Sequence, residues 1–335
     1  MFNSHIVFVL GAGANWELGM PLGRRLADTI AKKMRIAFDR KGHFTGEGDY
    51  PLFQELSAFF GETEALRAAA RLSSGLQFVK SIDDFLDFNS ADKPVVNSGK
   101  AAIIKSILEA EFQTKLMDGQ PGSTQFTPDR LHDTWFVKFM RLMGQGDPEQ
   151  FFDKSTFVVF NYDRCLEYFL YYAVAALFGL SSGEAARIVN KASIFHPYGR
   201  VASLRELDPS GLPLGSTNIE FKPLMENIRT YTEEIAEQDK LKALHERIES
   251  ARAIVFLGFA FHEQNMRLLR PASGLSFRKI FATADGISES DAPIIEGRIR
   301  QLFNSGPILT ELIKVRRDLK CAALFDEYQY TLPTL

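Results

Sequence analysis

Short apolar runs recur along the chain and predict the strands of a buried sheet. Six segments are rich in β-branched and aromatic residues and carry few charges. Near-continuous apolar runs of this length are typical of strands that are covered on both faces, as in a parallel sheet. The predicted strands are Ile6–Leu10, Thr156–Phe160, Ser193–Phe195, Ala253–Leu257, Lys279–Ala284 and Cys321–Phe325.

The stretches between these runs have the periodicity of helices. From Leu224 to Arg252, apolar residues recur every three or four positions and charges occupy the positions between them. The apolar run Tyr168–Gly183 predicts a buried helix, because it is shorter than the roughly 18 to 20 residues that a membrane span requires. Strands that alternate with helices favour an α/β fold built on a parallel six-stranded sheet.

The interval between the first two predicted strands is long. Residues 11–155 amount to about 145 positions, far more than one crossover helix requires. We therefore expect a single domain over residues 1–335, with a helical insertion over about residues 38–150 after the first strand. The helices predicted in this interval are Leu22–Phe38, Leu52–Phe60, Glu64–Leu72, Ser98–Leu116 and Pro128–Met143.

Composition narrows the functional classes. The chain has 335 residues and is 45% hydrophobic, and its 39 Lys and Arg against 42 Asp and Glu give a formal net charge of −3. No overall positive field attracts nucleic acid or an anionic membrane, so we expect neither direct nucleic acid binding nor membrane association. The two cysteines, Cys165 and Cys321, are too few for a disulfide framework or a four-cysteine zinc site. We therefore expect a cytoplasmic protein without a metal site.

A glycine-rich turn follows the first predicted strand. In Gly11-Ala12-Gly13-Ala14-Asn15, the glycines permit a tight turn and let a diphosphate approach backbone N–H groups at the start of a helix. The segment has no third glycine where the dinucleotide-binding fingerprint requires one. Two interpretations stay open: a nucleotide-binding loop, or a strand-to-helix turn that uses glycine for steric reasons alone.

Polar side chains follow the next two predicted strands, where ligands of open α/β sheets bind. Asn161 and Asp163 follow the second strand and place an amide and a carboxylate two residues apart. Asp163 is equally suited to cap the helix that follows. His196 follows the third strand, before Pro197 and Gly199, which fix a turn. This position suits a general base, although a single histidine is more often structural.

Two weaker candidates follow the fourth and fifth strands. Gly258 is able to admit a ribose or phosphate close to the backbone, while the neighbouring Phe259 and Phe261 are equally explained as core residues. Asp285 follows the fifth strand and is placed to contact an adenosine ribose hydroxyl. The Asp285-Gly286 pair is explained just as well by turn chemistry.

Taken together and in this order, these segments resemble the sirtuin superfamily, specifically the bacterial sirtuin-like NAD hydrolases of antiphage defence. They span roughly residues 6–290. The segments that carry the resemblance are the Gly11–Ala14 loop with Gly19-Met20-Pro21, Ser81–Leu86, Phe160-Asn161-Tyr162-Asp163, His196 before Gly199, and Leu257–Phe261.

The resemblance implies a Rossmann-like domain that cleaves NAD into nicotinamide and ADP-ribose. The catalytic residues would be Asn161, Asp163 and His196. Asn161 and Asp163 would lie near the nicotinamide ribose and carboxamide, and His196 would be the catalytic base. Two departures argue against protein deacylation: paired cysteines of a zinc module are absent after His196, and Asn15 replaces a serine that commonly follows the glycine loop. The residues expected to bind NAD are Gly11, Ala12, Gly13, Asn15, Pro21, Gly258, Phe259 and Asp285.

The resemblance also carries expectations about partners and regulation. An unrestrained NAD hydrolase would harm its host, so we expect a homo-oligomer whose activity is gated by assembly or by a partner such as a HerA-type ATPase or another sensor protein. Two alternatives stay open. One is an NAD-dependent protein deacylase, and the other is a non-catalytic module that senses NAD or ADP-ribose.

Overall fold

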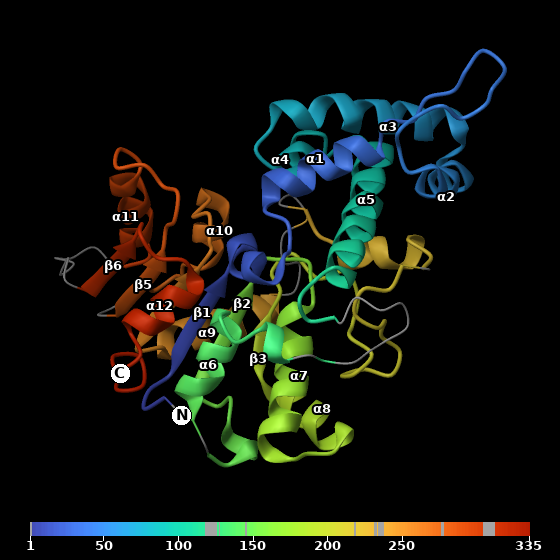
Figure 1. The fold of residues 1–335 in the computed structure, drawn as a ribbon. Coiled ribbons are helices and arrows are strands. Elements are labelled where there is room, and N and C mark those ends of the chain that lie inside the picture. The colour runs from blue at the N-terminus through green and yellow to red at the C-terminus, as the bar shows by residue number, and fades with distance from the viewer. Residues whose placement is uncertain are drawn as a thin grey trace.

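A computed structural model describes residues 2–117, 126, 128–144, 146–217, 219–230, 233, 238–275, 278–303 and 312–335. It is an α/β fold with one six-stranded, all-parallel sheet, as predicted (Figure 1). The strand order is β3-β2-β1-β4-β5-β6, so the first strand lies at the centre of the sheet. The strands are β1 (Ile6–Leu10), β2 (Ser155–Val159), β3 (Ser193–Phe195), β4 (Ala253–Leu257), β5 (Lys279–Thr283) and β6 (Ile313–Arg316).

The sixth strand lies elsewhere than predicted. Cys321–Phe325 is not a strand but part of helix α12 (Cys321–Glu327), and β6 is formed by Ile313–Arg316 instead. An apolar run of five residues is too short for its period to distinguish a strand from a helix. The alanine and leucine residues of this segment favour a helix. Strand β6 is an edge strand and carries Lys314 and Arg316, so it lacks the apolar run by which the central strands are recognised.

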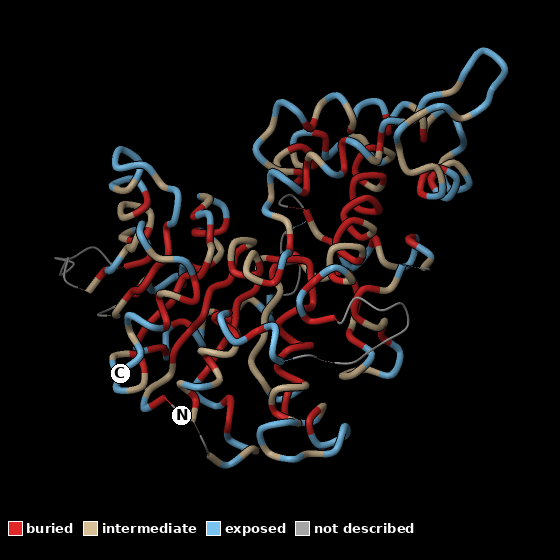
Figure 2. The backbone as a smooth tube through the Cα atoms, in the orientation of Figure 1, coloured by how far each residue is buried: buried red, intermediate tan, exposed pale blue. Residues whose placement is uncertain are grey.

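The central strands are buried (Figure 2), and their side chains belong to two cores, one on each face of the sheet. Phe8 of β1 joins a core on one face with Phe157, while Val7 and Val9 join a second core on the other face. Helices α6 (Trp135–Met143), α7 (Cys165–Phe178) and α12 contribute to the first core, and α9 (Gln238–Ser250) and α11 (Ala292–Arg300) to the second. Every residue of β1, β2 and β4 is buried, which explains their apolar composition.

A group of helices stands on the side of the sheet where β1 ends (Figure 1). The long α5 packs against α1 and α3, so α1 belongs to this group although it precedes residue 38. In contrast, α6 packs against α12 beside the sheet. The helices of the group are α1 (Gly23–Lys33), α2 (Tyr50–Phe60), α3 (Glu62–Gly75), α4 (Ile82–Phe88) and α5 (Lys93–Phe112).

The predicted helix from Leu224 to Arg252 is interrupted. A 3-10 helix covers Lys222–Asn227, Ile228 has extended backbone angles, and α9 begins only at Gln238. Residues 231–232 and 234–237 of the predicted helix lie outside the described residues. The apolar run after Tyr168 forms most of α7, which is followed by α8 (Ser182–Lys191); the short α10 (Glu263–Leu268) follows β4.

A membrane span is not found in the part of the chain that the structure describes. None of its helices combines the length and the apolar character that crossing a bilayer requires. The longest helix of the described residues is α5, which has 20 residues and includes Lys100, Lys105, Glu109 and Glu111.

Candidate active site

The ends of β2, β1 and β4 bring the predicted site segments together. These three strands are neighbours and run parallel, so the turns that follow them meet at one edge of the sheet. Residues Ala12–Leu18 form a 3-10 helix after β1, and Gly258 follows β4 directly. The central edge of the sheet is therefore the place where the sequence motifs converge.

Glycine is required where the turns after β1 and β4 cross. A Cβ atom on Gly11 would lie 2.5 Å from the Gly258 carbonyl oxygen, and one on Gly258 would lie 2.1 Å from the Gly13 carbonyl carbon. Gly258 also has a φ of +54°, which side-chain-bearing residues rarely adopt. Thr283 of β5 supports the crossing, because its hydroxyl accepts a hydrogen bond from the Gly258 N–H at 2.8 Å.

Most N–H groups of the glycine loop bond to the protein itself. The Gly11 N–H donates to the Leu257 carbonyl at 3.0 Å, the Gly13 N–H to the Gly258 carbonyl at 3.0 Å, and the Ala14 N–H to the Gly11 carbonyl at 2.9 Å. The structure therefore supports the steric interpretation of these glycines. Within the described part of the chain, the Ala12 N–H has no such partner and is the donor that the loop offers to a ligand.

Side chains of the segment Asn161-Tyr162-Asp163 contact two other parts of the chain. The Asn161 amide donates to the Gly11 carbonyl at 3.1 Å. The Tyr162 hydroxyl donates to the Asp83 carboxylate of α4 at 2.5 Å. Burial raises the pKa of Asp83 to about 6, against the opposing effect of the Tyr162 hydrogen bond. The segment is thus fixed to both the glycine loop and the helical insertion.

Asp163 contacts the glycine loop through the side chain of Asn15. Its Oδ1 accepts a hydrogen bond from the Asn15 amide at 2.7 Å and from the Cys165 N–H at 3.0 Å, where α7 begins. Its contact with the first N–H of α7 agrees with the capping alternative. Burial raises the pKa of Asp163, while the Asn15 hydrogen bond acts in the opposite direction. Asn15 Oδ1 is buried and has no hydrogen-bond partner.

His196 lies beside Asn161, on the turn after β3. Its Nδ1 is 3.4 Å from the Asn161 backbone carbonyl oxygen, and its Nε2 is 2.9 Å from Glu167 Oε1. The same Glu167 oxygen accepts a hydrogen bond from Arg200 at 2.6 Å. Burial alone would raise the pKa of Glu167, but His196 and Arg200 outweigh it and lower that pKa to about 2. The carboxylate facing His196 is therefore ionised at neutral pH.

A cavity of about 460 Å³ is lined by His196, but the glycine loop, Asn161 and Asp163 do not line it. Its volume suits a small molecule. Its lining includes His196, Arg200, Ser203, Asn227, Arg229 and Lys240.

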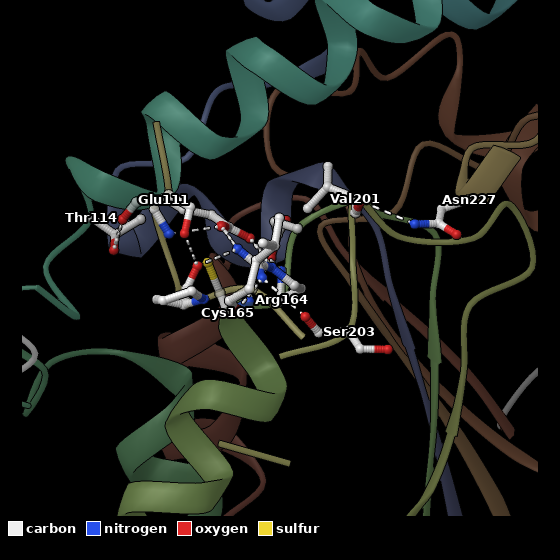
Figure 3. Close-up of polar contacts among 12 residues, drawn as sticks. Glu111, Thr114, Arg164, Cys165, Val201, Ser203 and Asn227 are labelled. Carbon is white, nitrogen blue, oxygen red and sulfur yellow. Dashed lines mark hydrogen bonds and ion pairs between the residues drawn. The ribbon is translucent and has the colours of Figure 1, made fainter. Parts of the chain in front are cut away.

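A buried ion pair joins α5 of the insertion to the segment that carries Asn161 (Figure 3). The Glu111 carboxylate accepts hydrogen bonds from the Arg164 side chain at 2.5 and 3.1 Å, from the Arg164 N–H at 2.9 Å and from the Gly215 N–H at 3.1 Å. Both side chains are fully buried. Burial would lower the pKa of Arg164, but Glu111 outweighs it and raises that pKa. The insertion is thus anchored one residue from Asp163.

Of the other predicted binding residues, Phe259 contacts the loop only through its backbone, since a Cβ on Gly11 would lie 2.7 Å from the Phe259 Cα. The Phe259 side chain is buried against Phe160, Phe256 and Phe261, as the core alternative expects. Pro21 lies between the 3-10 helix and α1, and Asp285 is exposed after β5.

Sequence reasoning missed three charged residues of the site: Glu111, Glu167 and Arg200. Glu167 follows Asn161 by six positions and lies within an otherwise apolar helix, and a charge inside an apolar run is the signal that identifies it. Glu111 is a charge on the buried face of α5, which the periodicity of that helix reveals. Arg200 has no comparable signal, because its role follows from its contact with Glu167.

A comparison of the chain with protein-family models, curated proteins and solved structures finds no match. The site is therefore interpreted from its own geometry.

Metal binding has no support in the described residues. No group of three or more His, Cys, Asp or Glu side chains among them is arranged to hold a metal ion. Near the glycine loop the Ala12 N–H is an open donor, whereas Asn15 Oδ1 is buried. Beside His196 lie the Asn161 backbone carbonyl and a cavity whose lining includes Arg200, Arg229 and Lys240.

Proposed function

We propose that the protein binds NAD and hydrolyses its nicotinamide–ribose bond, giving nicotinamide and ADP-ribose. The observation that carries the proposal is the contact between His196 and Asn161, whose amide in turn contacts the glycine loop at Gly11. An amide and an imidazole thereby lie beside a nucleotide-loop candidate at the carboxyl edge of a parallel sheet. The resemblance of the same segments to sirtuin-like NAD hydrolases supports this assignment.

The reaction requires little acid catalysis. The bond between the ribose anomeric carbon and the pyridinium nitrogen breaks with its electron pair leaving on nicotinamide, which departs as a neutral molecule. Positive charge develops at the anomeric carbon, in a state like that of glycoside hydrolysis. Water then bonds to this carbon and loses a proton. The Asn161 amide would orient the ribose hydroxyls or the water, and His196 would polarise that hydroxyl or accept the proton of the water.

The remaining parts of NAD would extend along the glycine loop. The Ala12 N–H would be a donor to the diphosphate there. Gly11, Gly13 and Gly258 let the turns after β1 and β4 cross closely, which fixes the shape of the loop along which the diphosphate would lie. In this proposal Asp163 acts on Asn15 and on α7, which makes it a supporting residue of the site.

Regulation belongs to the same proposal. NAD depletion as an antiphage response requires an inactive resting state, so the chain would act as a cytoplasmic homo-oligomer gated by assembly or by a HerA-type ATPase or another sensor protein.

Replacing His196 with alanine is expected to lower NAD turnover by about 10² to 10⁴-fold, the usual contribution of a positioned base. Asn161→Ala is expected to abolish NAD loss as well. Released nicotinamide, measured by chromatography, gives the rates, and thermal unfolding checks the fold. His43→Ala is the matched control, because that side chain is 74% exposed and, among the described residues, pairs only with Asp39. Turnover in His196→Ala equal to that of the control would refute the role of His196.

A further inference from the structure

The Glu167 carboxylate contacts His196 at Nε2, whereas the Asn161 backbone carbonyl lies near Nδ1, the other ring nitrogen. Glu167 belongs to the first turn of α7, and its side chain is only 2% exposed. Its Oε1 lies 2.9 Å from His196 Nε2 and 2.6 Å from Arg200. Glu167 Oε1 is therefore a buried, ionised acceptor that contacts both the His196 imidazole and the Arg200 guanidinium.

Glu167 is held as an anion by its surroundings. Arg200 and His196 both lie within ion-pair distance of it. The N-terminal end of α7 adds the positive end of a helix dipole, which favours a negative charge in the first turn. An ionised carboxylate accepts hydrogen bonds but cannot donate one.

The two ring nitrogens of His196 compete unequally for a single proton. Nε2 faces a charged acceptor at 2.9 Å, whereas Nδ1 faces a neutral backbone carbonyl at 3.4 Å, near the limit of a hydrogen bond. Hydrogen bonds to an ionised acceptor are roughly twice as strong as neutral ones. The neutral ring therefore carries its proton on Nε2, and the lone pair is left on Nδ1, the nitrogen that faces Asn161.

From this geometry we infer that Glu167 is a positioning residue, which fixes the tautomer of His196 so that Nδ1 is its basic nitrogen. The inference rests on the proposed function for its catalytic meaning. A base oriented by a third group is the arrangement of the serine-protease triad, and here Nδ1 lies on the side of Asn161. Arg200 keeps the carboxylate charged and shares its Oε1.

The tautomer is measured directly by long-range proton–nitrogen NMR on the full chain labelled with ¹⁵N-histidine, at mildly alkaline pH. The His196 signals are assigned by their loss in His196→Ala. The expected spectrum has a protonated Nε2 and an unprotonated Nδ1. A proton on Nδ1 alone, or protons on both nitrogens, would overturn the inference. This measurement needs neither activity nor a Glu167 variant.

A Glu167→Gln variant supplies the second test. Loss of the charge is expected to lower kcat by up to about 10⁴-fold, as when the carboxylate that orients a catalytic histidine is replaced by its amide, with little change in KM for NAD. The His196 spectrum is expected to change to a mixture of tautomers. The matched control is Glu246→Gln, an exposed carboxylate on α9. An unchanged spectrum in a folded Glu167→Gln protein would contradict the inference, whereas the expected spectra without NAD turnover by the wild type would contradict only the proposed function.

Discussion

Glu111→Ala is expected to lower the free energy of unfolding by about 3 to 5 kcal/mol, the cost of leaving one member of a buried ion pair without its partner. Arg164 is fully buried, and most of its charge compensation comes from the Glu111 carboxylate. The N–H groups of Arg164 and Gly215 also lose their acceptor. Urea unfolding followed by circular dichroism measures the change.

A neighbouring carboxylate on the same helix serves as the control. Glu109 forms an ion pair with Lys33 at 2.6 Å, but its side chain is 36% exposed. Because partly exposed pairs contribute roughly 0 to 1 kcal/mol, Glu109→Ala is expected to have a small effect. If the two variants lost the same stability, the Glu111–Arg164 pair would not be the anchor of the insertion.

The second large effect is expected at Gly258. An alanine there would adopt a left-handed conformation, at a cost of about 1 to 2 kcal/mol. Its Cβ would also lie 2.1 Å from the Gly13 carbonyl carbon and 2.2 Å from the Ala14 nitrogen, so the backbone must move. Overpacking of this kind costs about 1 to 3 kcal/mol more. We expect Gly258→Ala to lose about 2 to 5 kcal/mol and to displace the glycine loop, as measured by chemical unfolding.

Gly286→Ala separates the two contributions. Gly286 has a φ of +81°, so it shares the left-handed conformation, but a Cβ there would meet no atom within 4 Å. It is therefore expected to lose only the conformational part. A Gly258→Ala protein as stable as Gly286→Ala would show that the two turns do not need to cross so closely.

The central sheet was predictable from the sequence because its strands are buried on both faces. Continuous apolar runs identified β1, β2, β4 and β5, and the alternation of strands with helices identified the parallel fold. The edge strand β3 was also predicted, although its three residues are only half-buried. The same rule was wrong at the edge, where β6 carries charges and the apolar run Cys321–Phe325 belongs to a helix. Period alone does not separate a strand from a helix over five residues.

The sequence predicts which strand ends carry the site, but it does not predict which side chains contact one another there. Asn161 and His196 follow adjacent strands, so their proximity follows from the topology. The pairing of Glu111 with Arg164 joins residues 53 positions apart, and that of Glu167 with His196 joins residues 29 apart. Such pairs depend on how the insertion and α7 pack, which no local pattern along the chain encodes.

Hydrolysis of NAD is tested by a mass balance of NAD incubated with the purified protein, alone and with proteins encoded beside its gene, and with and without an acylated peptide. We expect NAD to be converted to equal amounts of nicotinamide and ADP-ribose without the peptide. NAD hydrolysis is the function proposed for this protein. It would be contradicted if NAD stayed intact in every mixture, or if nicotinamide appeared only when the acylated peptide was present.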